Sequence, residues 1–149
     1  KKAFTISGNP KKTYLPPKRL SLVPDFDFTP LDESHKRLEA SAWKYEKALT
    51  GVKKGVLSAE KKSQVNQLLR EVEQAMTRSD GLPRRKWFKN MIYAPGFYTG
   101  YGVKTLPGIR EGLEERNWDE THFYILEVAK ALDRAAAKIN AAADILKAS

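Results

Sequence analysis

The residues that could carry catalytic chemistry are few and lie far apart. The chain has two histidines, His35 and His122, and no cysteine, which excludes disulfides, thiolate metal sites and cysteine nucleophiles. Neither histidine belongs to an H-E-x-x-H-like arrangement, and each falls on an apolar helical stripe, where histidine is more often a packing residue than a ligand. No G-x-S-x-G turn and no Walker-type phosphate loop occurs. The sequence therefore predicts no metal site, no cofactor and no complete active site, and a stand-alone enzyme is the least favoured class of function.

Residues 83–107 carry the chemistry of a binding surface. This segment holds six of the fifteen aromatic residues and no acidic residue. Aromatic and arginine side chains dominate protein interfaces, and the same mixture can stack single-stranded bases and hold phosphates. A third interpretation is that some of these rings only cover the end of a helical bundle. The aromatic members are Trp87, Phe88, Tyr93, Phe97, Tyr98 and Tyr101, and the basic ones include Arg84, Arg85, Lys86, Lys89 and Lys104.

The net charge of +9 and the pI near 9.7 are concentrated in two segments. Residues 1–20 and residues 81–110 each carry six basic residues and no acid, whereas 31–80 and 111–149 are close to balance at +2 and −3. A local basic excess predicts an anionic partner. For residues 1–20 we interpret the excess as a solvated basic arm.

Proline marks out the predicted helices. All eight prolines lie between residues 10 and 30 or between 83 and 107, and proline disfavours helix interiors, so residues 31–82 and 108–149 are expected to be helical. Thr29 and Pro30 are typical of a helix start, with the threonine as N-cap, and Gly51 is expected to end that helix. Its predicted buried face follows steps of three and four residues: Leu31, His35, Leu38, Ala42, Tyr45 and Leu49.

Two further long helices are predicted. Ser58 is expected to cap one that ends near residue 79, with a buried face of Val65, Leu68, Leu69, Val72, Ala75 and Met76. Asn117 is expected to cap the last helix, with Glu120 at N3. Apolar residues of this last helix recur with a period of 3.5 between Trp118 and Leu146, and its many alanines allow close packing. We therefore expect it to run through the middle of a bundle.

The predicted fold class is all-α. It is a helical bundle of three long helices plus a short one starting at 105–107, with a long irregular loop at one end. Residues 1–28 show no period and are predicted to form an irregular N-terminal arm, with residues 29–149 as the helical domain. A short strand at 90–93 is an alternative for part of the loop.

The order of several short motifs resembles one known family. Gly-Leu-Pro-Arg-Arg at 81–85, Asn-Met-Ile-Tyr-Ala-Pro at 90–95 and Leu-Pro-Gly-Ile at 106–109 are followed by Trp118 and an alanine-rich stretch at 135–143. Asp-Phe-Thr-Pro-Leu at 27–31 also fits. Together they resemble the transferrin receptor-like dimerisation domain, the C-terminal helical domain of the glutamate carboxypeptidase and transferrin receptor family. The resemblance spans about residues 25–147.

This resemblance implies partners and a site. It implies a symmetric homodimer, contacts with the peptidase and apical domains of a longer parent chain, and zinc in that peptidase domain rather than here. In the carboxypeptidase branch, a Lys-Tyr pair in the loop after Tyr-Ala-Pro binds the terminal glutamate of the substrate. Tyr101 matches that tyrosine, Gly100 stands where the lysine would be, and Lys104 is the nearest replacement. The parent is expected to be a zinc-dependent carboxypeptidase-like hydrolase.

Two classes of function remain to be compared. The first is a homodimerisation module whose 96–104 loop contributes to the substrate pocket of the parent, with Trp87, Phe88, Tyr93, Phe97, Tyr98 and Trp118 as interface candidates. The alternative is a basic helical nucleic-acid-binding domain. It ranks lower, because the long helices lack the basic face that a groove-binding helix needs. No apolar run is long enough to span a bilayer, so we expect no membrane contact by this chain, although the resemblance is compatible with a single-pass parent of the secretory or vacuolar system or the cell surface.

Overall fold

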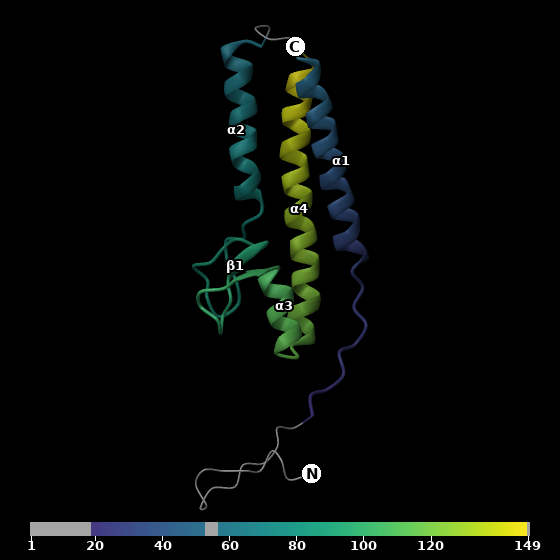
Figure 1. Cartoon of the computed structure of the whole chain (residues 1–149), viewed down its shortest axis with the longest axis vertical. Coiled ribbons are helices and arrows are strands. Elements are labelled where there is room, and N and C mark those ends of the chain that lie inside the picture. The colour runs from purple at the N-terminus through teal and green to yellow at the C-terminus, as the bar shows by residue number, and fades with distance from the viewer. Residues whose placement is uncertain (1–18, 53–56, 149) are drawn as a thin grey trace, which may run out of the picture.

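The computed structural model describes residues 19–52 and 57–148. Its elements are α1 (Thr29–Gly51), α2 (Ala59–Ala75), β1 (Tyr93–Pro95), β2 (Val103–Thr105), α3 (Pro107–Glu114) and α4 (Trp118–Lys147). The predicted all-α class is confirmed, with three long helices and one short one in the described part of the chain. α4 lies in the middle, with α1 and α2 on either side of it (Figure 1).

The α1 helix packs along α4 through small side chains. Ser34, Ser41 and Ala48 are its buried residues, at intervals of seven. Each serine hydroxyl donates to the backbone carbonyl three residues earlier, at 2.8 Å from Ser34 to Leu31 and 2.6 Å from Ser41 to Leu38. The serines are thus satisfied within their own helix and leave room for the backbone of α4 to approach.

Three of the six residues predicted to form the buried face of α1 are exposed. His35, Ala42 and Leu49 are exposed, while Leu31, Leu38 and Tyr45 are half-buried beside the small residues. The prediction followed hydrophobicity, and serine does not count as hydrophobic. The predicted face therefore left out Ser34 and Ser41, which are buried in the structure.

The start of α1 also differs from the prediction. The helix begins at Thr29 itself, and the residue before it, Phe28, makes no side-chain cap. Asp27 takes that role, because its Oδ1 accepts a hydrogen bond of 2.9 Å from the Thr29 backbone N–H. The hydrogen bonds from Thr29 hold the pKa of Asp27 below its ordinary value. The two other predicted caps are confirmed: Ser58 accepts from Lys61 N–H and Asn117 from Glu120 N–H, both at 3.2 Å.

The α2 helix is less deeply buried than the sequence predicts. Val65 is its one buried residue among those described, and the rest of its predicted face is half-buried. At the C-terminal end of α2, Arg134 of α4 donates hydrogen bonds to the backbone carbonyls of Ala75 and Thr77, at 3.0 and 3.1 Å. α2 thus contributes one apolar stripe to one neighbour, which explains why most of that stripe remains partly accessible.

The segment between α2 and α3 is more ordered than a long irregular loop. β1 and β2 pair as an antiparallel hairpin, with Tyr93 opposite Thr105 and Pro95 opposite Val103. The strand lies three residues later than the predicted one at 90–93, and its partner was not predicted. The residues between α2 and α3 join α3 and α4 in one buried cluster: Leu82, Met91, Ala94, Ile109, Tyr124, Ile125, Val128 and Ala131.

The short α3 helix lies between the hairpin and the N-terminal half of α4 (Figure 1). It approaches α4 closely through glycines. A Cβ built on Gly108 would meet the ring of Tyr124, and one on Gly112 would meet Thr121. The position of α3 therefore depends on these two residues having no side chain.

Residues 19–28 form neither helix nor strand, and Phe26 rests on Trp118 with ring centroids 6.0 Å apart. The rest of the predicted arm, residues 1–18, lies outside the described residues. Among the described residues, none of the helices combines the length and hydropathy required to cross a membrane.

Candidate functional site

The hairpin lobe, defined as residues 81–106, carries the candidate site. Its first turn is built around Gly81, which has a positive φ of 69°. A side chain there would meet the backbone of Lys86. The Leu82 N–H donates to the Phe88 carbonyl at 2.8 Å, and the buried Leu82 side chain anchors the turn in the core. The turn brings the two adjacent arginines, Arg84 and Arg85, to the surface of α3 and α4.

The tip loop, residues 96–102, connects β1 to β2. The Gly96 N–H donates to the Gly102 carbonyl and the Gly100 N–H to the Gly96 carbonyl, each at 3.0 Å. Gly100 has a φ of 64°, a conformation that other residues rarely adopt. These bonds give the loop a defined shape, and the Tyr98 and Tyr101 side chains project from the lobe.

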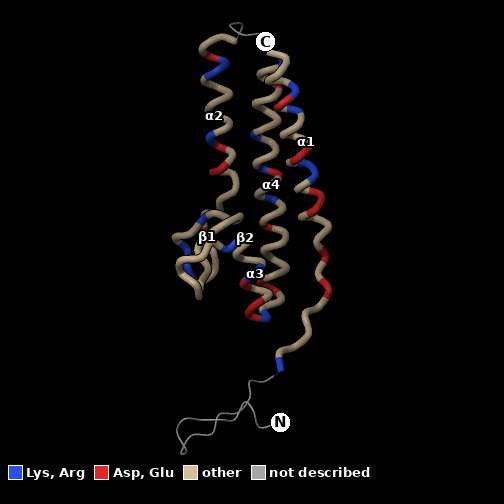
Figure 2. The backbone as a smooth tube through the Cα atoms, in the orientation of Figure 1, with Lys and Arg blue, Asp and Glu red and all other residues tan. Residues whose placement is uncertain are grey.

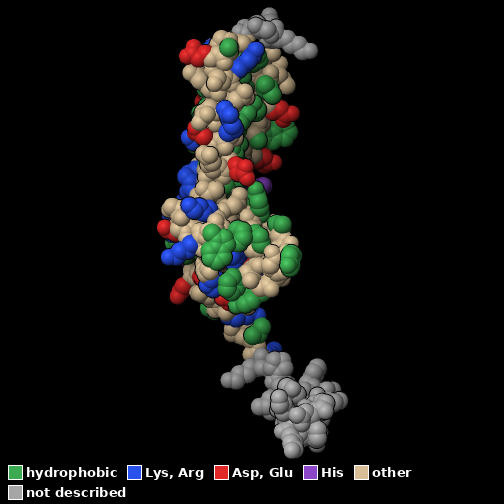
Figure 3. All heavy atoms as spheres, turned by 90° about the vertical axis from the view of Figure 1, so that its left-hand side faces the viewer, with side chains coloured by type: hydrophobic (Ala, Val, Ile, Leu, Met, Phe, Trp, Pro, Cys, Tyr) green, Lys and Arg blue, Asp and Glu red, His purple; other side chains and the backbone are tan. Residues whose placement is uncertain are grey.

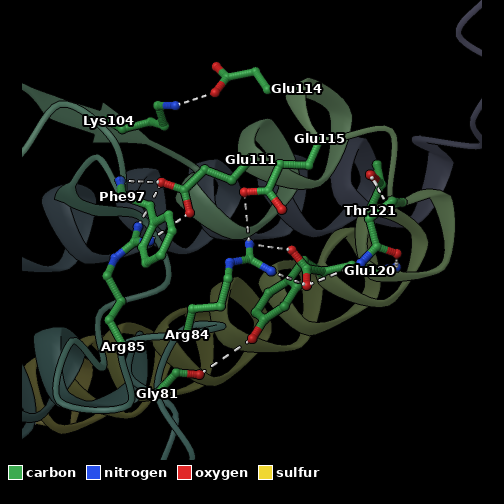
Figure 4. A network of polar contacts seen from close by, with 12 residues as sticks. Gly81, Arg84, Arg85, Phe97, Lys104, Glu111, Glu114, Glu115, Glu120 and Thr121 are labelled. Atoms are coloured by element: carbon green, nitrogen blue, oxygen red, sulfur yellow. Dashed lines mark hydrogen bonds and ion pairs between the residues drawn. The ribbon is translucent and has the colours of Figure 1, made fainter. Parts of the chain in front are cut away.

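A buried ion pair lies beneath the tip loop. Arg85 and Glu111 are only 3% and 1% exposed, and they form two hydrogen bonds of 2.7 and 2.8 Å. The same Glu111 carboxylate accepts a bond of 2.9 Å from the Phe97 backbone N–H (Figure 4). Burial raises the pKa of Glu111, but the bonds from Arg85 and Phe97 outweigh it and the pKa lies below its ordinary value. Glu111 is thus held as a carboxylate. We call this buried ion pair the Arg85–Glu111 clamp.

Arg84 makes a second, outer pair. Its guanidinium donates to both oxygens of Glu120, at 3.1 and 3.0 Å, and lies 3.5 Å from Glu115 (Figure 4). The Phe97 ring lies 5.4 Å from the Arg84 guanidinium and 5.6 Å from that of Arg85, within the range of cation–π attraction. Both arginines therefore contact the tip loop through Phe97.

The acidic residues of α3 and α4 offset the basic excess of the lobe. Arg84, Arg85 and Lys104 pair with Glu120, Glu111 and Glu114, respectively. Figure 2 shows basic residues on the lobe facing acidic ones around α3. The charge of +6 counted along residues 81–110 overstated the positive potential, because the neutralising acids follow later in the chain. This pairing does not favour the nucleic-acid alternative.

Several of the most exposed aromatic side chains lie on the lobe. Trp87 is 74% exposed, Tyr98 is 75% exposed and Tyr101 is fully exposed, with Val103 at 72%. The space-filling view shows apolar side chains gathered over this part of the molecule (Figure 3). Such a group is typical of a contact surface. We call Trp87, Tyr98, Tyr101 and Val103 the aromatic patch.

The other interface candidates are more enclosed. Phe88 packs against the core cluster, and Trp118 lies against Phe26. Tyr93 is half exposed and donates from its hydroxyl to Glu73 at 2.8 Å. Phe97 lies over the clamp. The structure thus separates the predicted set into rings that support the lobe and rings that face solvent.

The predicted pocket residues fall in two places. Gly100 and Tyr101 lie on the tip loop, where the space beside the Gly100 Cα is open. Lys104 lies on β2, and its ammonium group pairs with Glu114 of α3. Its charge is therefore already engaged with Glu114.

Sequence reasoning missed the Arg85–Glu111 clamp. The two residues are 26 positions apart, and neither belongs to a recognisable spacing with the other. Within residues 19–52 and 57–148, no group of three or more His, Cys, Asp or Glu side chains is placed to hold a metal ion.

Comparison with known proteins agrees with the motifs. The family of the transferrin receptor-like dimerisation domain matches residues 26–140. A probable glutamate carboxypeptidase, LAMP1, of Arabidopsis thaliana is 31% identical over 90 residues, covering 56% of this chain and 13% of that protein. A probable glutamate carboxypeptidase of Arthroderma benhamiae is 27% identical over 124 residues, covering 83% of this chain and 17% of that protein. The chain thus spans less than a fifth of either relative, and it belongs to the transferrin receptor-like dimerisation domain family.

Proposed function

We propose that this chain is the dimerisation module of a glutamate carboxypeptidase-like protein. Two copies pair through their long helices, and the hairpin lobe of each faces the peptidase domain of its parent. The observation that carries this proposal is the family match over residues 26–140, which takes in α1, α2, the hairpin lobe, α3 and most of α4. The two similar proteins named as probable glutamate carboxypeptidases support the nature of the parent.

Exposed apolar side chains on α1 support pairing through the helices. Trp43 is 66% exposed and Leu49 is 49% exposed. Tryptophan is enriched among the residues that contribute most to protein interfaces. A symmetric dimer would place the same face of α1 from both copies at the interface.

The tip loop supports the second part of the proposal. Tyr101 is fully exposed, and a neighbouring domain could contact it without rearranging the lobe. Gly100 offers no cation for a glutamate side chain, and the ammonium group of Lys104 is held by Glu114. We therefore propose that the parent has a weaker preference for a terminal glutamate than the lysine-bearing branch of the family. The zinc that the resemblance implies would belong to the peptidase domain.

Sedimentation equilibrium of the 149-residue chain tests the pairing. At about 100 μM, well above a micromolar dissociation constant, we expect a mass twice the 16.9 kDa of the chain. The variant Trp43→Glu should weaken the dimer by about tenfold or more, whereas Tyr101→Ser, on the tip loop, should leave it unchanged. A monomeric mass at every concentration, or a dimer that only Tyr101→Ser weakens, would contradict pairing through the helices.

A further inference from the structure

The Arg85–Glu111 clamp joins three segments that are separate in the sequence. Arg85 comes from the turn at 81–88, Glu111 from α3, and the Phe97 N–H from the tip loop. In Figure 4 the Glu111 carboxylate faces the Arg85 guanidinium and the Phe97 backbone at once. A single carboxylate thus accepts hydrogen bonds from two other parts of the lobe.

The stability of the fold does not by itself explain a buried ion pair at this place. Transferring both charges from water is unfavourable, and well-packed apolar residues in their place are often as stable or more stable. The Nε of Arg85 is also buried without a hydrogen-bond partner among the described residues, which adds to the unfavourable desolvation. Apolar residues could fill the space, but they could not accept a hydrogen bond from the Phe97 N–H.

That bond attaches the tip loop to α3 at Phe97. Phe97 and Tyr98 stack edge to face with ring centroids 4.9 Å apart. The Gly96 N–H donates to the Gly102 carbonyl and the Gly100 N–H to the Gly96 carbonyl, and these two bonds close the loop around Phe97 and Tyr98. A shift of the Phe97 backbone is therefore transmitted to Tyr98 directly and to Tyr101 through the closed turn.

We propose that Arg85 and Glu111 are positioning residues that hold the tip loop in the conformation that presents Tyr98 and Tyr101 to a neighbouring protein surface. The nature of that surface, the peptidase domain of the parent, rests on the proposed function. The positioning itself is a property of this chain and can be measured without a partner.

The main test replaces the pair by apolar residues in the whole 149-residue chain. The double variant Arg85→Met with Glu111→Leu should remain folded, with the amides of Ile125 and Val128 as slow to exchange as before. The amides of Phe97 and Gly100 should exchange about ten- to hundredfold faster, the effect expected when a hydrogen bond to a charged group is lost. These rates are read by NMR hydrogen exchange.

A matched control uses the exposed pair between α1 and α4. Arg37 and Asp133 also form two hydrogen bonds, at 2.7 and 3.0 Å, but the pair lies at the surface. Arg37→Met with Asp133→Leu should leave exchange at Phe97 and Gly100 unchanged. An unchanged tip loop in the folded clamp variant would overturn the proposal, as would an equal change in the control.

A second pair of variants keeps the test valid if the clamp variant does not fold. Phe97→Pro deletes the N–H donor but leaves both buried charges in place, and Phe97→Leu removes the ring but keeps the donor. Faster exchange at Gly100 in the proline variant, but not in the leucine variant, supports the proposal. Equal exchange in the two variants contradicts it. A chain that passes this test but stays monomeric would refute the proposed function and leave the positioning role intact.

Discussion

The α1–α4 contact and the hairpin lobe are held together by different kinds of buried residue. Along α1, small side chains at intervals of seven face α4, and each serine satisfies its own hydroxyl within the helix. In the lobe, a charged pair and a backbone N–H connect segments 14 to 26 residues apart. Small residues allow two helices to approach closely, whereas a bidentate ion pair requires its two groups to meet in one orientation. The first arrangement suits a rigid framework, and the second suits the positioning of one loop.

The exposed pairs sharpen this comparison. Arg37–Asp133 is bidentate like Arg85–Glu111, although Arg37 donates from Nε and Nη2 and Arg85 from its two Nη atoms, and its side chains are about half exposed instead of buried. Exposed pairs contribute little to stability because water already solvates both charges. The location of a pair, more than its geometry, decides what its loss does to the molecule.

The largest effect is expected from breaking the clamp on one side. Glu111→Ala leaves the Arg85 charge buried without its partner and should lower the free energy of unfolding by about 3–5 kcal/mol. Asp133→Ala at the exposed pair should lower it by less than about 1 kcal/mol. Urea denaturation of both variants measures the difference. A similar loss of unfolding free energy in the two variants would mean that burial does not decide how much each ion pair contributes.

The next effect is expected at the α1–α4 contact. Ser41→Leu places a large side chain where the backbones approach closely and should destabilise the fold by about 1–3 kcal/mol. Ala42→Leu changes the neighbouring, exposed position and should stay within about 0.5 kcal/mol. Denaturation midpoints of the two variants compare them directly. A larger loss of stability from Ala42→Leu would show that the buried face of α1 is the one that the hydrophobic pattern predicted.

A smaller effect is expected from pH. The pKa of Glu111 lies below its ordinary value in the folded chain, as do those of Asp27 and Glu71. The unfolded chain therefore takes up protons first as the pH falls, and the stabilisation is present above about pH 5 and is lost through the ordinary glutamate range near 4.3 and below. Denaturation between pH 7 and pH 3 should show this loss. The Arg85→Met, Glu111→Leu variant should lose less stability over the same range, and an identical pH dependence would contradict a lowered pKa at Glu111.

The smallest effect is expected at the aromatic patch. Tyr101 is fully exposed, so Tyr101→Ala should leave the free energy of unfolding within about 0.5 kcal/mol of the parent chain. Thermal denaturation followed by circular dichroism checks this. A clear destabilisation would show that the ring supports the lobe and does not serve as a free contact surface.

Much of the framework could be predicted from the sequence. Proline positions, the caps at Ser58 and Asn117 and the apolar period of the last helix all depend on neighbours within one or two turns. Such local signals predict helices well. The central place of α4 also followed from its alanines and its long apolar stripe.

The rest depends on contacts between distant residues. The predicted capping role of the Thr29 side chain is taken by Asp27, whose carboxylate accepts from the backbone N–H of Thr29. The β1–β2 pairing and the clamp need partners that the local pattern does not specify. Charge counted along residues 81–110 suggested a basic surface. The count misled because it left out Glu111, Glu114 and Glu120, which come later in the chain and pair with basic residues of the lobe.

The division between a pairing framework and a presented loop is tested most directly by hydrogen exchange at two concentrations of the chain, one above and one below the dissociation constant of the dimer. We predict that pairing slows exchange at the amides of α1 around Trp43 and leaves the tip loop unchanged. Protection that appears in the tip loop and not in the helices would contradict the account.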